Sequence, residues 1–293
     1  MAQAWKCSGL RWAADGPVLT WIGGRRSAPA RGERVAFAVA EGGVRTCVGA
    51  RGHACPVRAG VPGRSVGARC EECARLDRAH SVAADTLADD PRPYRVYLAW
   101  FGPGLTKVGI TACERGSARL LEQGAVCFSW LGHGPLMAAR RTEELLRAAL
   151  GVPDRIPYAH KRAVRTGLPG SEAERAAEIA ELHARAVGLG GWPDSLTPEP
   201  FRSVDHAGVF GIEGVDRGPA VVGEVAELVA GGAIGGGLVA AAGPDLHLAT
   251  ERGVVVLDTR LMTGWELVSV EGAPCAVPVR ELRRAAEVQD GLF

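Results

Sequence analysis

One stretch of the chain, residues 94–111, constrains the fold more than any other. It runs Tyr-Arg-Val-Tyr-Leu-Ala-Trp-Phe-Gly-Pro-Gly-Leu-Thr-Lys-Val-Gly-Ile-Thr, so an apolar run meets a Gly-Pro-Gly turn and a second short run follows. Glycine permits positive φ angles and proline presets its own φ, which allows such a turn to close tightly. The stretch therefore predicts a β-hairpin.

The chain on either side of this hairpin carries its own groups of structural signals. Its 293 residues are enough for two or three domains, and its 47% hydrophobic content is typical of a globular protein. Short apolar runs separated by glycine turns predict strands before residue 46 and after residue 201. We expect an α+β protein with three parts: an N-terminal β unit with a cysteine module (1–90), an α/β domain with an extra helix (94–195), and a β-rich C-terminal domain (201–293).

Individual elements can also be predicted from periodicity and from capping residues. The segment 171–187 opens with Ser-Glu-Ala-Glu, which is a capping box, and continues as an amphipathic helix. Four further helices are expected at 74–88, 114–122, 136–150 and 279–288. A strand is expected at 125–131, where it should end in the turn Gly132-His-Gly-Pro135.

The chain shows no feature that would send it into or across a membrane. Its N-terminus lacks the apolar core of a signal peptide. The longest apolar region, residues 220–243, is rich in glycine and contains Glu224 and Glu227, so it would make a poor membrane span. We expect a cytoplasmic protein.

Four of the eight cysteines lie close together in the sequence. Cys47 and Cys55 are separated by seven residues, and Cys70 and Cys73 form a C-x-x-C pair. Two such pairs can supply the four thiolates of a structural zinc site of zinc-ribbon type. The segment between the pairs is rich in glycine and proline and cannot build a core, so a metal ion would explain how it keeps its structure.

Alternatives to this zinc site remain open. His53 or His80 could replace one of the cysteine ligands. Cys70 and Cys73 could instead form a redox-active dithiol, or the cysteines could be unrelated buried thiols.

Positive charge is concentrated in two stretches, although the net charge of the whole chain is only +1. Residues 45–78 contain seven arginines against three acidic residues, a local net charge of +4. Residues 107–165 contain ten Lys/Arg against five Asp/Glu, a local net charge of +5. Such stretches fit a phosphate-bearing partner. The alternative is that arginine is simply abundant in a chain rich in Ala, Gly and Arg.

The region from 94 to 150 resembles the core of the GIY-YIG nucleases, in the branch whose second motif reads Lys-Ile/Val-Gly-x-Thr. Val96-Tyr97-Leu98 stands where that family has Gly-Ile-Tyr, and Lys107-Val-Gly109 stands where it has Tyr-Ile-Gly. Arg119 occupies the place of the family arginine, and Glu143 that of its metal-binding glutamate. The whole chain also resembles an uncharacterised bacterial family of unknown function that joins a cysteine-rich zinc module to such a core.

The nuclease resemblance implies metal-assisted phosphodiester hydrolysis. Tyr97 would orient or deprotonate a water molecule, Arg119 would neutralise the attacked phosphate, and Glu143 would hold a Mg²⁺ ion. Lys107 replaces the second tyrosine of the family. It could accept a proton only if burial lowered its pKa, and otherwise it would be a phosphate clamp.

Three functional hypotheses follow, and they leave open whether the protein is an enzyme. The first is a zinc-containing protein that interacts with DNA or RNA and acts as a Mg²⁺-dependent nuclease. The second is a non-catalytic nucleic-acid-binding or regulatory module, which the loss of the second tyrosine favours. The third is an enzyme that acts on a small nucleotide-like ligand. Asp154, Arg155 and Lys161 follow the helix 136–150 and could line the same cleft.

Overall fold

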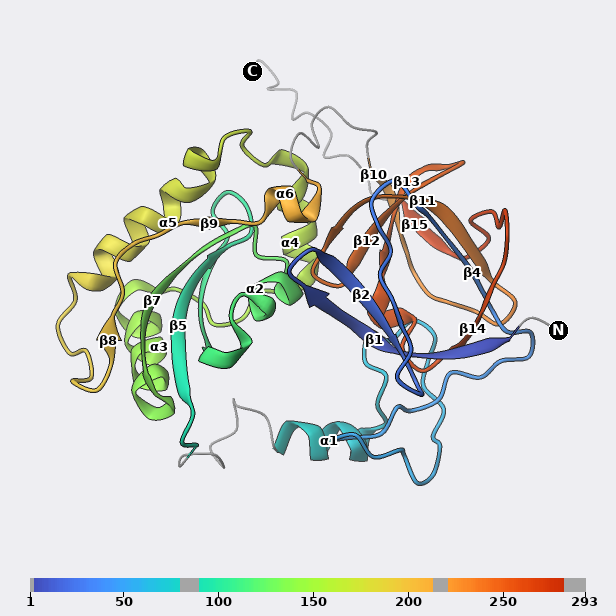
Figure 1. The fold of residues 1–293 in the computed structure, drawn as a ribbon, viewed down its shortest axis with the longest axis horizontal. Coiled ribbons are helices and arrows are strands. Elements are labelled where there is room, and N and C mark those ends of the chain that lie inside the picture. The colour runs from blue at the N-terminus through green and yellow to red at the C-terminus, as the bar shows by residue number, and fades with distance from the viewer. Residues whose placement is uncertain (1–2, 80–89, 213–220, 282–293) are drawn as a thin grey trace, which may run out of the picture.

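The computed structural model describes residues 3–79, 90–212 and 221–281, and the protein is α+β as expected. Figure 1 shows two halves, one in which helices surround a small sheet and one built mainly of strands. The helix 279–288 lies mostly outside the described residues, and its first three residues form a strand, β15, instead.

The strand-rich half is a single ten-stranded sheet with the order β15-β10-β13-β12-β11-β4-β14-β1-β2-β3. All neighbouring strands pair antiparallel except β10 and β13, which are parallel. The strands are β1 (Ala4–Ala13), β2 (Gly16–Trp21), β3 (Arg26–Ser27), β4 (Arg34–Val39), β10 (Val221–Val225), β11 (Ala233–Ala242), β12 (Asp245–Thr250), β13 (Gly253–Asp258), β14 (Glu266–Ser269) and β15 (Val279–Glu281).

The other half contains a smaller sheet with the order β6-β5-β7-β8, in which β9 also pairs with β7. Its strands are β5 (Pro93–Trp100), β6 (Thr106–Ala112), β7 (Cys127–Pro135), β8 (Thr197–Pro198) and β9 (Val204–Asp205). The helices are α1 (Glu71–Ala79), α2 (Ala118–Gln123), α3 (Leu136–Leu150), α4 (Tyr158–Val164), α5 (Glu172–Val187) and α6 (Ala207–Phe210), with 3-10 turns at Cys113–Arg115, Arg165–Gly167 and Thr259–Leu261.

The chain builds the large sheet from both of its ends. Strands β1–β4 come from the first forty residues and β10–β15 from the last third, and β4 lies between β11 and β14. Two of the three expected parts, 1–90 and 201–293, therefore contribute strands to one sheet. The small sheet and the helices around it come from residues 93–210, so β9 and α6 also belong to the expected part 201–293.

The predicted hairpin is confirmed, as are two of the predicted helices. Strands β5 and β6 pair from Tyr94↔Ala112 to Trp100↔Thr106, with the Gly-Pro-Gly turn between them. Helix α3 has the predicted bounds, and α5 begins with the expected capping box, in which Ser171 and Glu174 each bond to the backbone of the other.

Other expectations were wrong at the ends of elements. Strand β7 continues through Gly132–Pro135, where a turn was expected, because these residues pair with both β5 and β8. A Cβ atom on Gly132 would lie 2.8 Å from the carbonyl oxygen of Thr197, so glycine permits this close pairing. The segment 114–122 is a 3-10 turn followed by the shorter α2, and the helix expected at 74–88 begins earlier, at Glu71.

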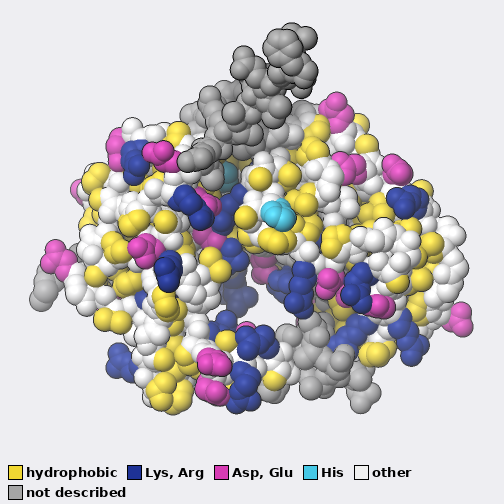
Figure 2. Space-filling view, turned by 180° about the vertical axis from the view of Figure 1, so that it is seen from behind, with side chains coloured by type: hydrophobic (Ala, Val, Ile, Leu, Met, Phe, Trp, Pro, Cys, Tyr) yellow, Lys and Arg dark blue, Asp and Glu magenta, His cyan; other side chains and the backbone are white. Residues whose placement is uncertain are grey.

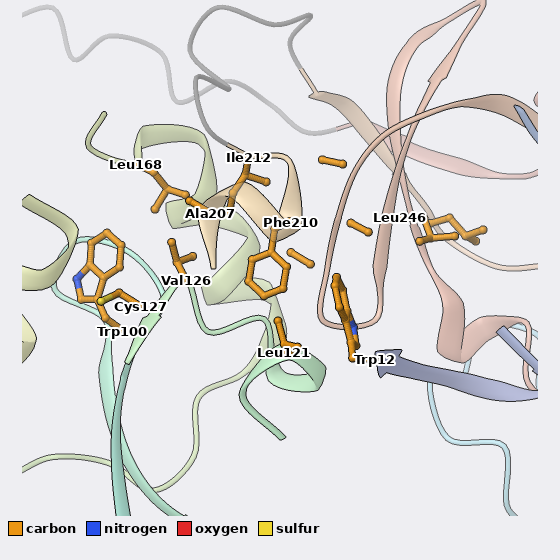
Figure 3. Close-up of a cluster of buried hydrophobic side chains, with 14 of the residues drawn as sticks. Trp12, Trp100, Leu121, Val126, Cys127, Leu168, Ala207, Phe210, Ile212 and Leu246 are labelled. Atoms are coloured by element: carbon orange, nitrogen blue, oxygen red, sulfur yellow. The ribbon is translucent and has the colours of Figure 1, made fainter. Parts of the chain in front are cut away.

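Apolar side chains join the two halves. Figure 3 shows Trp12, from the large sheet, facing Phe210 of α6, with Leu121 of α2 close by. The ring centroids of Trp12 and Phe210 are 5.1 Å apart in an edge-to-face arrangement, which is favourable for aromatic pairs. The indole nitrogen of Trp12 also donates to the carbonyl oxygen of Gly243, 2.7 Å away.

A buried ion cluster joins the same halves beside this apolar contact. Asp245 of β12 is 0% exposed and accepts hydrogen bonds from Arg162 of α4, at 2.6 and 3.0 Å, and from Arg165, at 2.7 Å. Arg162 also bonds to Asp258 at 2.6 Å and to Glu224 at 3.1 Å. One arginine of α4 thus contacts three strands of the large sheet.

The arginines keep Asp245 ionised despite its burial. Burial alone would raise the pKa of this carboxyl group, but the bonds from Arg162 and the charge of Arg165 outweigh it and lower the pKa. A carboxyl group whose pKa is lowered on folding stabilises the fold at neutral pH. That contribution is lost only as the pH falls through the folded-state value.

None of the described helices combines the length and the apolar character needed to cross a bilayer.

The first prediction concerns this cluster. Asp245→Asn removes the charge that Arg162 and Arg165 share, which leaves two largely buried guanidinium groups without their common partner. We expect the free energy of unfolding to fall by about 3–5 kcal/mol, measured by urea denaturation at neutral pH.

The matched control is Glu144→Gln, which breaks an exposed ion pair with Arg147 on α3. Such pairs contribute less than about 1 kcal/mol, so this variant should unfold almost like the parent. Equal losses in the two variants would show that the buried cluster does not hold the halves together.

Candidate metal centre and cationic site

The four cysteines predicted as one set lie together. Cys47 and Cys55 come from the loop after β4, Cys70 immediately precedes α1, and Cys73 lies in the first turn of α1. All four sulfur atoms lie within 4.8 Å of one another, and Cys55 Sγ and Cys70 Sγ are 4.0 Å apart. Four thiolates around a zinc ion at about 2.3 Å would be separated by about 3.8 Å, so the cluster has the dimensions of a metal site.

Backbone groups around the cluster donate hydrogen bonds to its sulfur atoms. The amides of Gly49 and Cys70 donate to Cys47 Sγ at 3.4 and 3.2 Å. A hydrogen bond from the Ala59 backbone is the main cause that lowers the pKa of Cys55 to about 7. Burial has the opposite effect on Cys73, whose pKa rises to about 12. Four thiols packed this closely can lose their protons together only when a cation neutralises them.

Of the two histidines considered as alternative ligands, His53 lies in the described part of the chain and His80 does not. His53 is exposed, and its backbone pairs with Ala50, so it is not among the clustered groups. His80 lies outside the described residues. Within the described part of the chain, the potential ligands of this centre are the four cysteines.

One arginine connects the cysteine module to the large sheet. Arg45 is 1% exposed and donates to four backbone carbonyl groups at 2.5 to 2.9 Å. Pro62 and Ser65 belong to the loop between the cysteine pairs, whereas Arg260 and Thr263 belong to the segment between β13 and β14. The Arg45 side chain therefore bonds the loop of the module to the segment that joins β13 and β14 of the large sheet.

Tyr97 and Lys107 lie on the same face of the small sheet. Tyr97 is opposite Gly109 and Ala99 is opposite Lys107, so the two side chains occupy neighbouring positions on adjacent strands. A Cβ atom on Gly109 would lie 2.3 Å from the Tyr97 hydroxyl group. The glycine of the Lys-Val-Gly motif thus provides the space that Tyr97 occupies.

The hydroxyl group of Tyr97 is held by Gln123 at the end of α2. Gln123 Nε2 donates to this oxygen at 2.8 Å, so the hydroxyl acts as an acceptor and its own proton remains available. Burial is the main cause that raises the pKa of Tyr97, and this keeps the proton on the hydroxyl at neutral pH.

Lys107 is a buried cation. It is 8% exposed, and its ammonium group donates to the carbonyl oxygen of Asp154 at 2.9 Å. Among the described residues, no carboxylate lies within ion-pair distance of it. Burial, followed by the charge of Arg119, lowers the pKa of Lys107 to about 8, and Glu143 acts in the opposite direction.

Arg119 and Glu143 come from two different helices, α2 and α3. Arg119, on α2, is exposed, and its nearest carboxylate in the described structure is that of Glu122, 3.9 Å away. Glu143, on α3, is half-buried, and burial raises its pKa. The charges of both residues contribute to the pKa shifts of Tyr97 and Lys107, with burial as the main cause of each shift.

Lys161, on α4, was expected only as a residue that could line the same cleft, and the structure shows that it is buried there. It is 3% exposed, donates to the carbonyl oxygen of Gln123 at 3.1 Å, and lies 3.8 Å from the centroid of the Phe101 ring. Burial, together with the charge of Lys107, lowers its pKa to about 7. A basic residue on a short helix normally faces solvent, so no sequence signal indicated this burial.

The structure thus assembles a cationic site, defined here as Tyr97, Lys107, Arg119, Gln123, Glu143 and Lys161. Figure 2 shows that Lys and Arg side chains gather near the middle of this face of the molecule. An anionic ligand that bound there would meet positive charge on several sides.

No curated protein matches the chain, and no solved structure does either. A family model does match, over residues 32–267, and it covers both the cysteine module and the cationic site. The chain therefore belongs to the family described as protein of unknown function DUF2797.

Proposed function

We propose that this protein binds nucleic acid at the cationic site and hydrolyses phosphodiester bonds there. The observation that carries this proposal is the burial of the Lys107 ammonium group without a carboxylate partner among the described residues. Buried charges are normally paired, and the phosphates of a bound strand would supply the missing negative charge. A tyrosine hydroxyl and a glutamate lie beside Lys107, as in the nuclease core that the sequence resembles.

The pKa values suggest what each group does. Tyr97 keeps its proton, so it would orient a water molecule or a phosphate oxygen by donating a hydrogen bond rather than by removing a proton. Lys107, whose pKa is about 8, is mainly charged at neutral pH and would bind phosphate oxygen. Arg119 is exposed and would neutralise charge on the attacked phosphate.

Glu143 fits the metal ligand that the resemblance implies. Magnesium usually keeps several waters and is bound by one or two carboxylates together with substrate phosphates. No described residue forms a hydrogen bond or an ion pair with the Glu143 carboxylate, and burial disfavours its charge. A divalent cation bound to Glu143 would stabilise its ionised carboxylate, and in hydrolysis it would supply Lewis acidity.

In the proposed reaction, a water oxygen bonds to phosphorus and the bond from phosphorus to the leaving sugar oxygen breaks. The proton of the water passes to solvent, or to Lys107 when Lys107 is neutral. The leaving oxygen takes a proton from solvent. Two cations and a hydroxyl donor around the phosphate would stabilise the additional negative charge of the transition state.

A second candidate is nucleic-acid binding without cleavage. The observation that favours it is the lysine at position 107, where the nuclease family has a tyrosine. The same residues would then form a binding site for phosphate, and Glu143 would have no catalytic part.

For the four-cysteine centre we propose a structural zinc ion. Four sulfur ligands with these separations suit zinc, which prefers tetrahedral thiolate coordination in structural sites. The ion would neutralise the clustered thiolates and hold a loop that has little apolar core of its own.

The Glu143→Gln variant separates cleavage from binding. With labelled single-stranded and duplex DNA and RNA in Mg²⁺, we expect cleavage to fall at least about 100-fold while affinity changes little. Glu144→Gln, one residue away on the exposed side of α3, is the matched control and should cleave like the parent. Cleavage that persists in Glu143→Gln would refute the catalytic assignment, and binding without cleavage by the parent would favour the second candidate.

The pH dependence of binding tests the role of Lys107. Its charged form predominates below pH 8 and is lost above it, so oligonucleotide affinity should weaken as the pH rises through about 8. Lys107→Met should remove this step and reduce the salt dependence of binding by about one counterion. A cleavage rate that instead increases through the same range, and loses that increase in Lys107→Met, would assign Lys107 as the base.

Metal content tests the cysteine centre. Protein purified without chelators should contain about one zinc ion per chain by elemental analysis, and Cys73→Ser should lose it. Cys275→Ser alters a buried cysteine outside the cluster and should retain the metal. Parent protein without zinc, or Cys73→Ser with a full complement, would contradict the zinc assignment.

A further inference from the structure

Helix α4 contacts both halves of the molecule. Arg162 bonds to carboxylates on three strands of the large sheet, and Arg165, just beyond the helix, bonds to one of them. Tyr158 and Lys161 contact the end of α2. The helix is therefore fixed by the large sheet and in turn contacts the cationic site.

The contacts with α2 supply hydrogen-bond donors to carbonyl groups at the end of that helix. Carbonyl groups in the last turn of a helix have no partner within the helix. Tyr158 donates its hydroxyl to the carbonyl oxygen of Glu122 at 3.2 Å, and the Lys161 ammonium donates to that of Gln123 at 3.1 Å. A positive charge at this end also interacts favourably with the helix dipole.

The bonded carbonyl belongs to the residue that orients Tyr97. The backbone oxygen of Gln123 accepts from Lys161, and its side-chain amide donates to the Tyr97 hydroxyl at 2.8 Å. A continuous path thus runs from Asp245 through Arg162, α4, Lys161 and Gln123 to that hydroxyl.

We infer that Lys161 is a positioning residue, through which the ten-stranded sheet fixes Gln123 and the Tyr97 hydroxyl in the cationic site. The site is then complete only when the two halves of the molecule are docked. The effect of Lys161 on turnover rests on the proposed function, whereas its effect on Tyr97 does not.

The surroundings of Lys161 support a role for its donor group rather than for its bulk. Its ammonium lies between the Phe101 and Tyr158 rings, 3.8 and 4.8 Å from their centroids, where a methylene chain alone would pack well. Burial nevertheless disfavours the charge and lowers its pKa to about 7. Burying an amine at this position costs free energy, and the hydrogen bond to Gln123 and the contacts with the two aromatic faces offset that cost.

Lys161→Met keeps the length of the side chain and removes the donor. We expect kcat for oligonucleotide cleavage to fall about 10- to 100-fold while KM stays within about twofold, because the variant displaces a group that acts on the reacting water. A residue that only stabilised the fold would leave the kcat of the folded fraction unchanged.

The orientation of Tyr97 can be followed without turnover. The chain has three tyrosines, so protein labelled with ¹³C at the tyrosine ring carbon that bears the hydroxyl gives three NMR signals, which Tyr97→Phe assigns. In Lys161→Met the Tyr97 signal should move, whereas that of Tyr94 should not, because its hydroxyl bonds to Asp90 instead. If parent protein does not cleave, the proposed function fails and this measurement still tests the inference.

A milder variant covers the case in which Lys161→Met does not fold. Tyr158→Phe removes only the hydroxyl that donates to Glu122, keeps the ring, and should move the Tyr97 signal in the same direction by a smaller amount. An unmoved Tyr97 signal in folded Lys161→Met, or in Tyr158→Phe where only that variant folds, would overturn the inference.

Discussion

The arrangement of this molecule depends on one buried carboxylate. Asp245 is inaccessible to solvent and is held by Arg162 of α4 and by Arg165 just beyond that helix, both from the other half of the structure. A buried charge is tolerated only with partners in good geometry, so the two halves have few ways of docking. The apolar contact between Trp12 and Phe210 contributes stability, but it tolerates a wider range of orientations than the hydrogen bonds of the ion cluster do. The ion cluster therefore specifies the docking geometry, and the position of α4 follows from it.

The cysteine module depends on a different constraint. Its loop contains few apolar side chains, and the described cluster around the four sulfurs consists only of cysteines, small alanines and one valine. Such a segment needs covalent or metal crosslinks to remain ordered. Arg45 adds a second restraint by bonding to carbonyl groups of the loop and of the large sheet. The module and the sheet are consequently linked by backbone recognition rather than by a shared core.

How much could be predicted from the sequence depended on how far apart the interacting residues are. The hairpin at 94–111 was predictable because the turn and both strands are contiguous, and the cysteine cluster because thiol spacing carries its own chemistry. The extension of β7 through Gly132–Pro135 was not, because the strand that pairs with it lies about sixty residues further along. The pairing of β4 with β11 could not be predicted for the same reason, because the two strands lie far apart in the sequence. The resemblance selected Tyr97, Lys107, Arg119 and Glu143 as one set, whereas the burial of Lys161 arises only after α4 has docked. Their catalytic roles remain predictions.

The strand order has a consequence for the way the protein is made. On the ribosome the N-terminal strands emerge first. The neighbours of β4 (Arg34–Val39) in the sheet are β11, which begins only at Ala233, and β14, which begins only at Glu266. The central hairpin and its helices can fold during this interval, because their contacts are local. Strands β1 to β4 must meanwhile stay unpaired at their open edges, where chaperones bind and where aggregation begins. Synthesis of the last third of the chain is therefore the step that completes the sheet, and with it the docking of α4.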